Sequence, residues 1–301
     1  MADTTNHSEL IIVLQELYTL LADLGAVPAE SVRLPDPNTG THPAGAINTE
    51  AAEAARYAPE TVTLMTALPY LAVAGGYELV PDTYSMNYLG KYLDKYSFHS
   101  FRQFPEIDRL LPTALQLTRF DRGGVMFIYD TATKLVYPFI PYRNNPDYVY
   151  DSCDSDDPYD PDDFSHVTGV PPREAFLPIV EDYRKLRHLV TPHRVEFRSP
   201  SMAESGGVMP EDWIHKPQEL WEASYAVWEA VQELRVLYLE CGWDMHAVKQ
   251  TRFRLGELRA RRDAYWRDVV EPLLRAVYKL DVSLDKLLAE WLVVDDGPPK
   301  Q

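Results

Sequence analysis

The chain has 301 residues, of which 46% are apolar and 25% charged, a composition typical of a globular protein with a full hydrophobic core. Its formal net charge of −17 disfavours contact with nucleic-acid phosphates, and no apolar stretch is long and uncharged enough to cross a bilayer. The first residues lack the basic start of a secretory signal, and two cysteines are typical of a reducing compartment, so we expect a cytoplasmic protein, with the nucleus as the alternative.

Residues 8–24 are predicted to form an N-terminal helix. Ser8 can cap its first turn, and Gly25 suits the left-handed position that follows a helix. Leucines recur along it at spacings of three and four, which aligns them in one seam: Leu10, Leu14, Leu17, Leu21 and Leu24. Two interpretations remain open. Either residues 1–25 dock onto their own chain, or residues 8–24 join two copies in a homodimer.

Residues 26–47 are rich in Pro, Gly and Asn, which predicts an extended, mobile linker. Two short helices are expected after it, over residues 48–56 and 59–68. Pro59 suits the first position of a helix, and Pro69 ends the second one. Four tyrosines then recur every fourth residue, which predicts a row of rings along one helix face: Tyr84, Tyr88, Tyr92 and Tyr96.

The densest β signal lies at residues 115–140, which read as three short strands joined by two tight turns. Gly123 and Gly124 favour the first reversal, and the polar residues 130–134 favour the second. The middle strand is apolar on both faces and should be central in its sheet, whereas Pro138 makes the end of the third strand either an edge or a terminus. We therefore predict an α+β fold, with a small antiparallel sheet flanked by helices and a C-terminal helical unit.

Two polar segments and a helical region complete the chain. Residues 144–172 contain eight aspartates and no Lys, Arg or Glu, which predicts a solvated loop whose spacing does not fit a calcium-binding loop. Within the helical region, Pro272 should kink or split the second helix. The predicted organisation is a docking helix (1–25), a linker (26–47), an α+β core (48–198), a second linker (199–212) and the helical unit (213–292).

The sequence contains none of the common hydrolase, dinucleotide, phosphate-loop or zinc motifs, so we predict no catalytic residue, cofactor or metal site. Two sets of residues remain as candidates. A ligand or partner surface would be formed by Tyr129, Asp130, Tyr137, Tyr142 and Arg143. A basic patch for an anionic partner would be formed by Arg252, Arg259 and Arg262, unless these arginines compensate acidic residues of their own chain.

Segments Phe120–Thr131, Val136–Tyr137 and Pro172–Leu177 resemble the SMI1/KNR4 (SUKH) superfamily in their glycine turn, aromatic-Asp turn, returning Val-Tyr strand and Phe-Leu helix. The resemblance covers residues 60–198. The whole chain, including Tyr238–Asp244, also resembles a family of uncharacterised proteins of filamentous fungi. The resemblance to the superfamily implies an α+β protein-interaction module rather than an enzyme.

We therefore predict a protein-interaction or scaffold module with a protein partner, and with neither a nucleic acid nor a membrane as partner. The alternative is an enzyme or accessory factor of fungal specialised (secondary) metabolism. Such a protein would hold a small molecule in an aromatic pocket, which needs no sequence motif.

Overall fold

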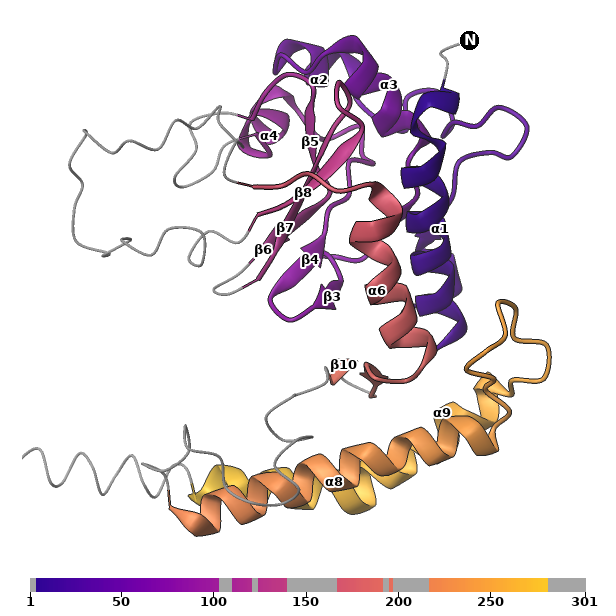
Figure 1. Ribbon diagram of the computed structural model, residues 1–301, viewed down its shortest axis with the longest axis vertical. Coiled ribbons are helices and arrows are strands. Elements are labelled where there is room, and N and C mark those ends of the chain that lie inside the picture. Colours follow the sequence, from indigo (N-terminus) through magenta and orange to yellow (C-terminus); the bar gives the residue numbers. More distant parts are fainter. Residues whose placement is uncertain are drawn as a thin grey trace, which may run out of the picture. The chain divides into compact units, whose positions relative to one another are not determined.

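The computed structural model describes residues 4–102, 110–120, 124–139, 167–191, 195–196 and 217–280. These residues confirm the predicted α+β fold class, because helices accompany small antiparallel sheets (Figure 1). The chain divides into two compact units, Met1–Arg184 and Lys185–Gln301. No helix among the described residues has the length and apolarity required to span a bilayer.

The central sheet of the first unit is antiparallel, with the order β5-β7-β8. Its strands are β5 (Ala114–Gln116), β7 (Met126–Asp130) and β8 (Leu135–Phe139). As predicted, β7 is the central strand and all five of its residues are buried, while Pro138 lies in the edge strand β8. The expected first strand is divided at Leu117, because β5 pairs with β7 and the next strand turns to a second sheet.

The second sheet of this unit has the order β3-β4-β6 and is built from β3 (Glu78–Val80), β4 (Thr83–Ser85) and β6 (Thr118–Phe120). Gly124 passes close to the turn between β3 and β4. A Cβ atom at this position would lie 2.0 Å from the carbonyl oxygen of Asp82, so only glycine allows the two backbones to approach.

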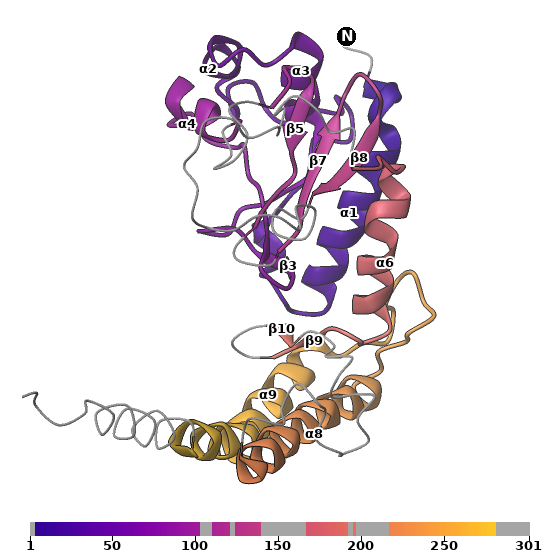
Figure 2. The ribbon, with the colours of Figure 1, turned by 60° about the vertical axis from the view of Figure 1, so that its left-hand side comes forward.

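Helices α1 (Ser8–Asp23) and α6 (Pro172–Arg184) lie side by side (Figures 1 and 2), and α6 packs against the central sheet β5-β7-β8. All five seam leucines are buried within the single chain, as the docking interpretation requires. Full burial of such a side chain contributes about 1.5–3 kcal/mol. An ion pair of 2.7 Å joins Arg184 of α6 to Glu16 of α1, and Phe176 lies 4.9 Å from Phe127 of β7, measured between ring centroids.

The ends of α1 match the prediction in part. Gly25 has a φ of 72°. Its N–H donates to the carbonyl oxygen of Ala22, and the N–H of Ala26 donates to the carbonyl oxygen of Leu21. This pair of hydrogen bonds is the Schellman motif that glycine favours. At the other end the prediction was wrong. Ser8 is the first helical residue, and the cap position belongs to His7, whose side chain makes no capping bond.

The prediction of a free linker at residues 26–47 was also wrong. Strand β1 (Val32–Arg33) pairs antiparallel with β2 (Tyr70–Leu71), and Ile47 is buried. The backbone N–H of His42 donates to the carbonyl of Thr66 at 2.8 Å, and its side-chain Nε2 donates to that of Leu68, also at 2.8 Å. The segment is extended only in part, because it contains a short 3-10 helix, Ala29–Ser31, and several turns, and the bonds of His42 attach it to the core.

The predicted row of tyrosines does not lie on one helix. Tyr84 is in β4 and Tyr88 is buried, whereas Tyr92 and Tyr96 are 83% and 70% exposed. Pairing of β4 with β6 removes the first tyrosine from any helix, and a new helix, α4 (Lys95–Ser100), starts after its cap residue Asp94. The local spacing was helical, but strand pairing determined the structure.

The two short helices were predicted at the correct places. Helix α2 (Thr49–Ala54) is capped by the side chain of Asn48, which accepts from the N–H of Ala51 at 3.2 Å. Helix α3 (Pro59–Ala67) has Pro59 in its first turn and ends before Pro69. Most of the aspartate-rich segment 144–172 lies outside the described residues. Its last part is anchored, because Val170 bridges to Val136 of β8.

The second unit contains the antiparallel pair β9 (Leu189–Val190) and β10 (Val195–Glu196), and a hairpin of α8 (Gln218–Glu240) with α9 (Leu255–Tyr265). The split that was one outcome predicted for Pro272 is absent, because the helix continues through this residue to residue 280. A π-helical turn, Trp266–Val270, ends two residues before it. The second helix begins at Leu255 rather than near residue 247. The linker 199–212 and the expected last helix near residue 283 lie outside the described residues.

The environment of His42 predicts a pH-dependent stability. Burial lowers its pKa below the ordinary value of 6.5, although its bond to Leu68 opposes this shift. The unfolded chain therefore binds this proton more tightly than the folded chain. The stabilising contribution is complete above the unfolded pKa, and it is lost as the pH falls through the lower, folded pKa. Wild-type protein should lose free energy of unfolding as the pH falls from about 7.5 to about 5.5.

His42→Gln retains a side-chain N–H donor but does not titrate, so its urea unfolding should depend less steeply on pH. His246→Gln, which replaces an exposed histidine, is the control and should retain the wild-type dependence. Equal slopes for wild type and His42→Gln would contradict the assignment.

Candidate functional site

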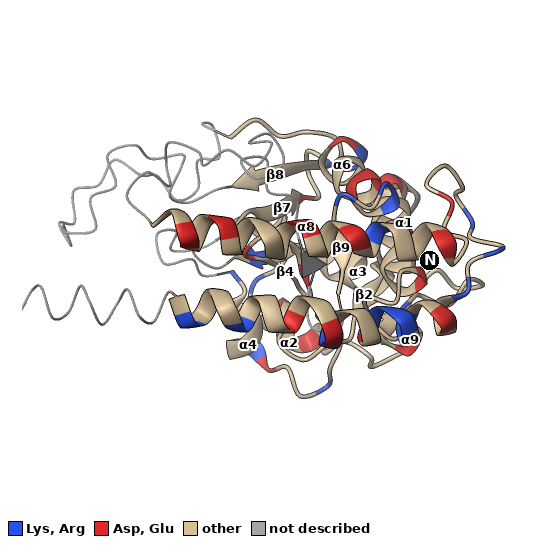
Figure 3. Ribbon diagram, turned by 90° about the horizontal axis from the view of Figure 1, so that it is seen from below, with Lys and Arg blue, Asp and Glu red and all other residues tan. Residues whose placement is uncertain are grey.

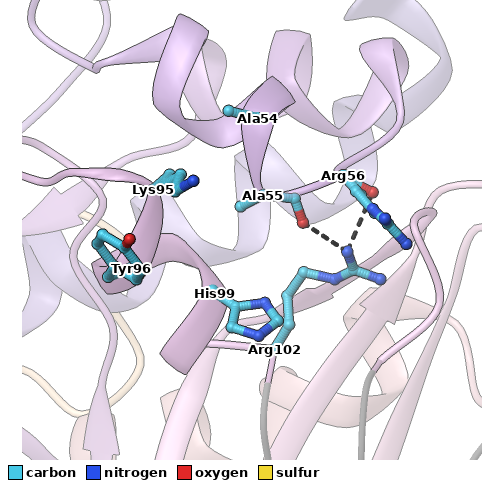
Figure 4. A pocket seen from close by; sticks show the side chains of 7 residues that line it. All are labelled: Ala54, Ala55, Arg56, Lys95, Tyr96, His99 and Arg102. Carbon is cyan, nitrogen blue, oxygen red and sulfur yellow. Dashed lines mark hydrogen bonds between the residues drawn. The ribbon is translucent and has the colours of Figure 1, made fainter.

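A pocket of about 240 Å³ lies in the first unit between the end of α2 and helix α4 (Figure 4). Four of the described residues that line it carry a basic side chain, and none of them is acidic. The lining residues are Ala54, Ala55, Arg56, Lys95, Tyr96, His99 and Arg102. A basic pocket is notable on a chain whose formal net charge is −17.

Arg102 is 3% exposed and forms the inner wall of the pocket. Its Nη1 donates to the carbonyl oxygens of Ala55 at 2.7 Å and Arg56 at 3.1 Å, and its Nη2 donates to that of Leu110. The guanidinium also lies 5.2 Å from the ring centroid of Tyr57. Because the carbonyls at a helix end attract a cation, Arg102 holds the last turn of α2 in place.

Arg56 directly follows the C-terminal cap of α2 and has a φ of 67°. Its N–H donates to the carbonyl oxygen of Glu53, and the N–H of Tyr57 donates to the carbonyl oxygen of Ala52. This pair of hydrogen bonds is again the Schellman motif. Glycine favours this left-handed position, and a residue with a Cβ costs about 1 kcal/mol or more there. Arg56 is therefore a strained residue, and its side chain is exposed at the pocket.

Helix α4 supplies the opposite wall. Asp94 caps it by accepting from the N–H of Ser97 at 2.8 Å and from its hydroxyl at 2.9 Å, and these bonds lower the pKa of Asp94. The Nζ of Lys95 lies 5.1 Å from the ring centroid of Tyr96, within the range of a cation–π contact. Figure 4 shows Lys95 and Arg56 on opposite sides, with His99 and Arg102 between them.

The chemistry of these groups favours binding of an anion. Guanidinium and ammonium groups donate charge-assisted hydrogen bonds to carboxylates and phosphates. Among the described lining residues, only Tyr96 carries a hydroxyl group, and none carries a thiol or a carboxylate. Within the described residues, no group of three or more His, Cys, Asp or Glu side chains is placed to hold a metal ion.

The predicted surface around Tyr129 is corrected by the structure. Tyr129 is 1% exposed, and its hydroxyl lies 2.8 Å from Nδ1 of His7, whose Nε2 donates to Glu60 at 3.1 Å. Burial, followed by nearby carboxylates, raises the pKa of Tyr129, so its hydroxyl stays neutral. Since the side chain lies in the core between a strand and the N-terminal turn, it is not available to a partner.

The remaining members of that set are not brought together as a pocket. Asp130 is buried and accepts from the N–H groups of Ala132 at 3.0 Å and Thr133 at 3.3 Å, so it shapes the turn after β7. Tyr137 is half-buried, with its hydroxyl 3.2 Å from that of Thr133. Tyr142 and Arg143 lie outside the described residues.

The predicted basic patch is divided in the second unit. Arg252 and Arg259 are exposed, but Arg262 is 6% exposed and faces the interior of the hairpin. Burial raises the pKa of Tyr238 to about 12, and the adjacent Arg262 opposes this rise. Figure 3 shows both signs of charge along α9. Internal compensation accounts for two neighbours of the patch, because Arg254 pairs with Glu257 at 2.6 Å and Arg261 with Glu240.

Sequence reasoning missed the pocket between α2 and α4. A partial signal was present, because Lys95 and His99 are four residues apart and share a face of the helix that Asp94 caps. Arg56 and Arg102 belong to other segments, and only the fold places them at the same pocket.

No protein-family model, curated protein or solved structure matches the chain.

The buried contact between His7 and Tyr129 gives a testable prediction. His7→Ala should lower the free energy of unfolding by about 1–3 kcal/mol, because the hydroxyl of Tyr129 loses its partner without gaining water. The measurement is urea denaturation of His7→Ala, Tyr129→Phe and the double variant. The double variant should lose less than the sum of the single losses, since it removes both polar partners. Additive losses would show that the two side chains are not coupled.

Proposed function

We propose that the chain is a protein-interaction or scaffold module, and that its first unit binds an acidic segment of a partner protein at the pocket between α2 and α4. A protein-interaction role is also what the resemblance to the SMI1/KNR4 superfamily implies. A location in the cytoplasm, or alternatively the nucleus, belongs to the same proposal.

The observation that carries the proposal is the pair of exposed cations at the pocket. Neither Arg56 nor Lys95 forms an ion pair with a carboxylate of the described residues. Other exposed arginines of the chain are paired, for example Arg254 with Glu257. Cations at a concave site that have no carboxylate partner among the described residues can be neutralised by a partner protein.

The surroundings of the pocket support a protein as that partner. Tyr96 lines the pocket and is 70% exposed, and Tyr92, four residues before it, is also exposed. Tyrosine and arginine are enriched in protein interfaces, where they contribute a large share of the binding energy. An acidic segment would place carboxylates against Arg56 and Lys95 and apolar groups against the tyrosine rings.

The structure gives less support to the alternative of an enzyme or accessory factor. That interpretation depends on an aromatic pocket around Tyr129, whose side chain is buried and already bonded to His7. None of the described residues of that set lines the pocket between α2 and α4.

The test is binding of fluorescent peptides, measured by anisotropy, to the full chain. A pool of degenerate acidic peptides should bind more tightly than a neutral pool of the same length. Lys95→Glu and Tyr96→Ala should each lower the affinity for the acidic pool about tenfold, as is typical when an interface residue that contributes strongly to binding is replaced.

Two matched variants serve as controls. Lys249→Glu makes the same change of charge at an exposed site of the second unit, and Tyr278→Ala removes a tyrosine that is also 70% exposed. Neither should change binding by more than about twofold, because neither residue is among those that line the pocket. Equal binding of the two pools, or equal losses in controls and pocket variants, would contradict the proposal.

A further inference from the structure

We infer that the group received by the pocket is a phosphomonoester on the acidic segment, and that Arg56 is its anchor. This inference rests on the proposed function, which it makes more specific. It depends on three observations, namely the backbone of Arg56, the absence of a described partner for its side chain, and the number of basic groups around a small volume.

The backbone of Arg56 is unfavourable for the residue present. Within the described part of the chain, the other non-glycine residues with a positive φ are Asp82, Lys134 and Leu186. Leu186 is completely buried, and Lys134 donates to the side chain of Asn6 at 3.2 Å, so both side chains have contacts within the chain. The exposed side chain of Arg56 has neither a hydrogen bond nor an ion pair to any described residue.

Glycine would end α2 at this position without strain, and the Schellman bonds are made by the backbone alone. For the described fold, glycine at position 56 would therefore serve as well as arginine. Strained residues of this kind occur at binding sites, where the side chain has a role that the fold does not require. A ligand that bonds the guanidinium accounts for the arginine.

The size and charge of the pocket favour phosphate over a carboxylate. A volume of about 240 Å³ admits one compact head group, and Arg56 and Lys95 line it together with His99 and Arg102. A carboxylate carries one charge and two oxygens in one plane. A phosphomonoester carries nearly two charges at neutral pH, and its three terminal oxygens can accept hydrogen bonds from several directions. A phosphate therefore matches a pocket whose described lining carries several cations better than a carboxylate does.

The experiment compares peptides with a central serine in an acidic sequence, in phosphorylated and unphosphorylated forms, together with phenyl phosphate as a free phosphomonoester. The proteins are the full-length wild type, Arg56→Gly, Arg56→Asn and Lys134→Gly. Both Gly and Asn tolerate a positive φ. Lys134→Gly is the matched control. It also removes the strain of a non-glycine residue with a positive φ and one positive charge, but Lys134 does not line the pocket.

The phosphorylated peptide should bind wild type and Lys134→Gly at least about tenfold more tightly than its unphosphorylated form, as expected for charge-assisted bonds. Arg56→Gly and Arg56→Asn should bind the phosphorylated and unphosphorylated peptides with similar affinities. Their melting temperatures should equal or exceed that of wild type, because strain is removed. A purely structural role for Arg56 would instead lower the melting temperature.

The remaining outcomes separate this inference from the proposed function. If both forms of the peptide bind equally and Arg56→Gly weakens both alike, the assignment of phosphate is wrong and the acidic-segment proposal stands. If phenyl phosphate binds wild type as tightly as the phosphopeptide and Arg56→Gly abolishes this, the phosphate site stands and the protein-partner proposal fails. If neither phosphopeptide nor phenyl phosphate binds, the inference is overturned.

Discussion

The buried guanidinium of Arg102 is the constraint on which the geometry of the pocket depends. A buried cation is costly unless its donors are satisfied, and three backbone carbonyls accept from this one. Two of them, of Ala55 and Arg56, end α2, and the third belongs to Leu110, a member of the core beneath the central sheet. Arg102 thus connects the strained turn at Arg56 to the core, so that α2 and α4 enclose a defined volume.

The proposed binding of an anion is compatible with the acidic composition of the chain. The net charge of −17 acts over the whole surface and is screened by salt, whereas the basic groups around the pocket act at contact distance. Arginine occupies position 56 with a positive φ, where glycine would be free of strain. If Arg56 binds as proposed, this is a trade of stability for function of the kind that binding sites often show. Tyr129 illustrates the opposite case. Its hydroxyl is a chemically useful group, but His7 uses it to secure the N-terminal turn to the sheet.

The sequence allowed prediction of elements that local physics determines. The leucine seam of α1, the cap-like role of Gly25 and the apolar faces of β7 required only periodicity and turn chemistry. The errors arose where distant pairing competed with local pattern. Tyr84 was drawn into a strand by its pairing with Arg119, and residues 26–47 were attached to the core through β1. The pocket was not predictable, because Arg56 and Arg102 are far apart in sequence and meet through tertiary structure.

The most direct test of the central claim is to locate binding on the structure. Amide resonances of isotope-labelled full chain can be followed by NMR while an acidic peptide selected from the degenerate pool is added. The account predicts that the largest shift changes occur at residues 54–57 and 95–102, the segments that line the pocket. Largest changes around Tyr137 on β8, or around Arg259 on α9, would contradict it and would place the binding surface on another part of the chain.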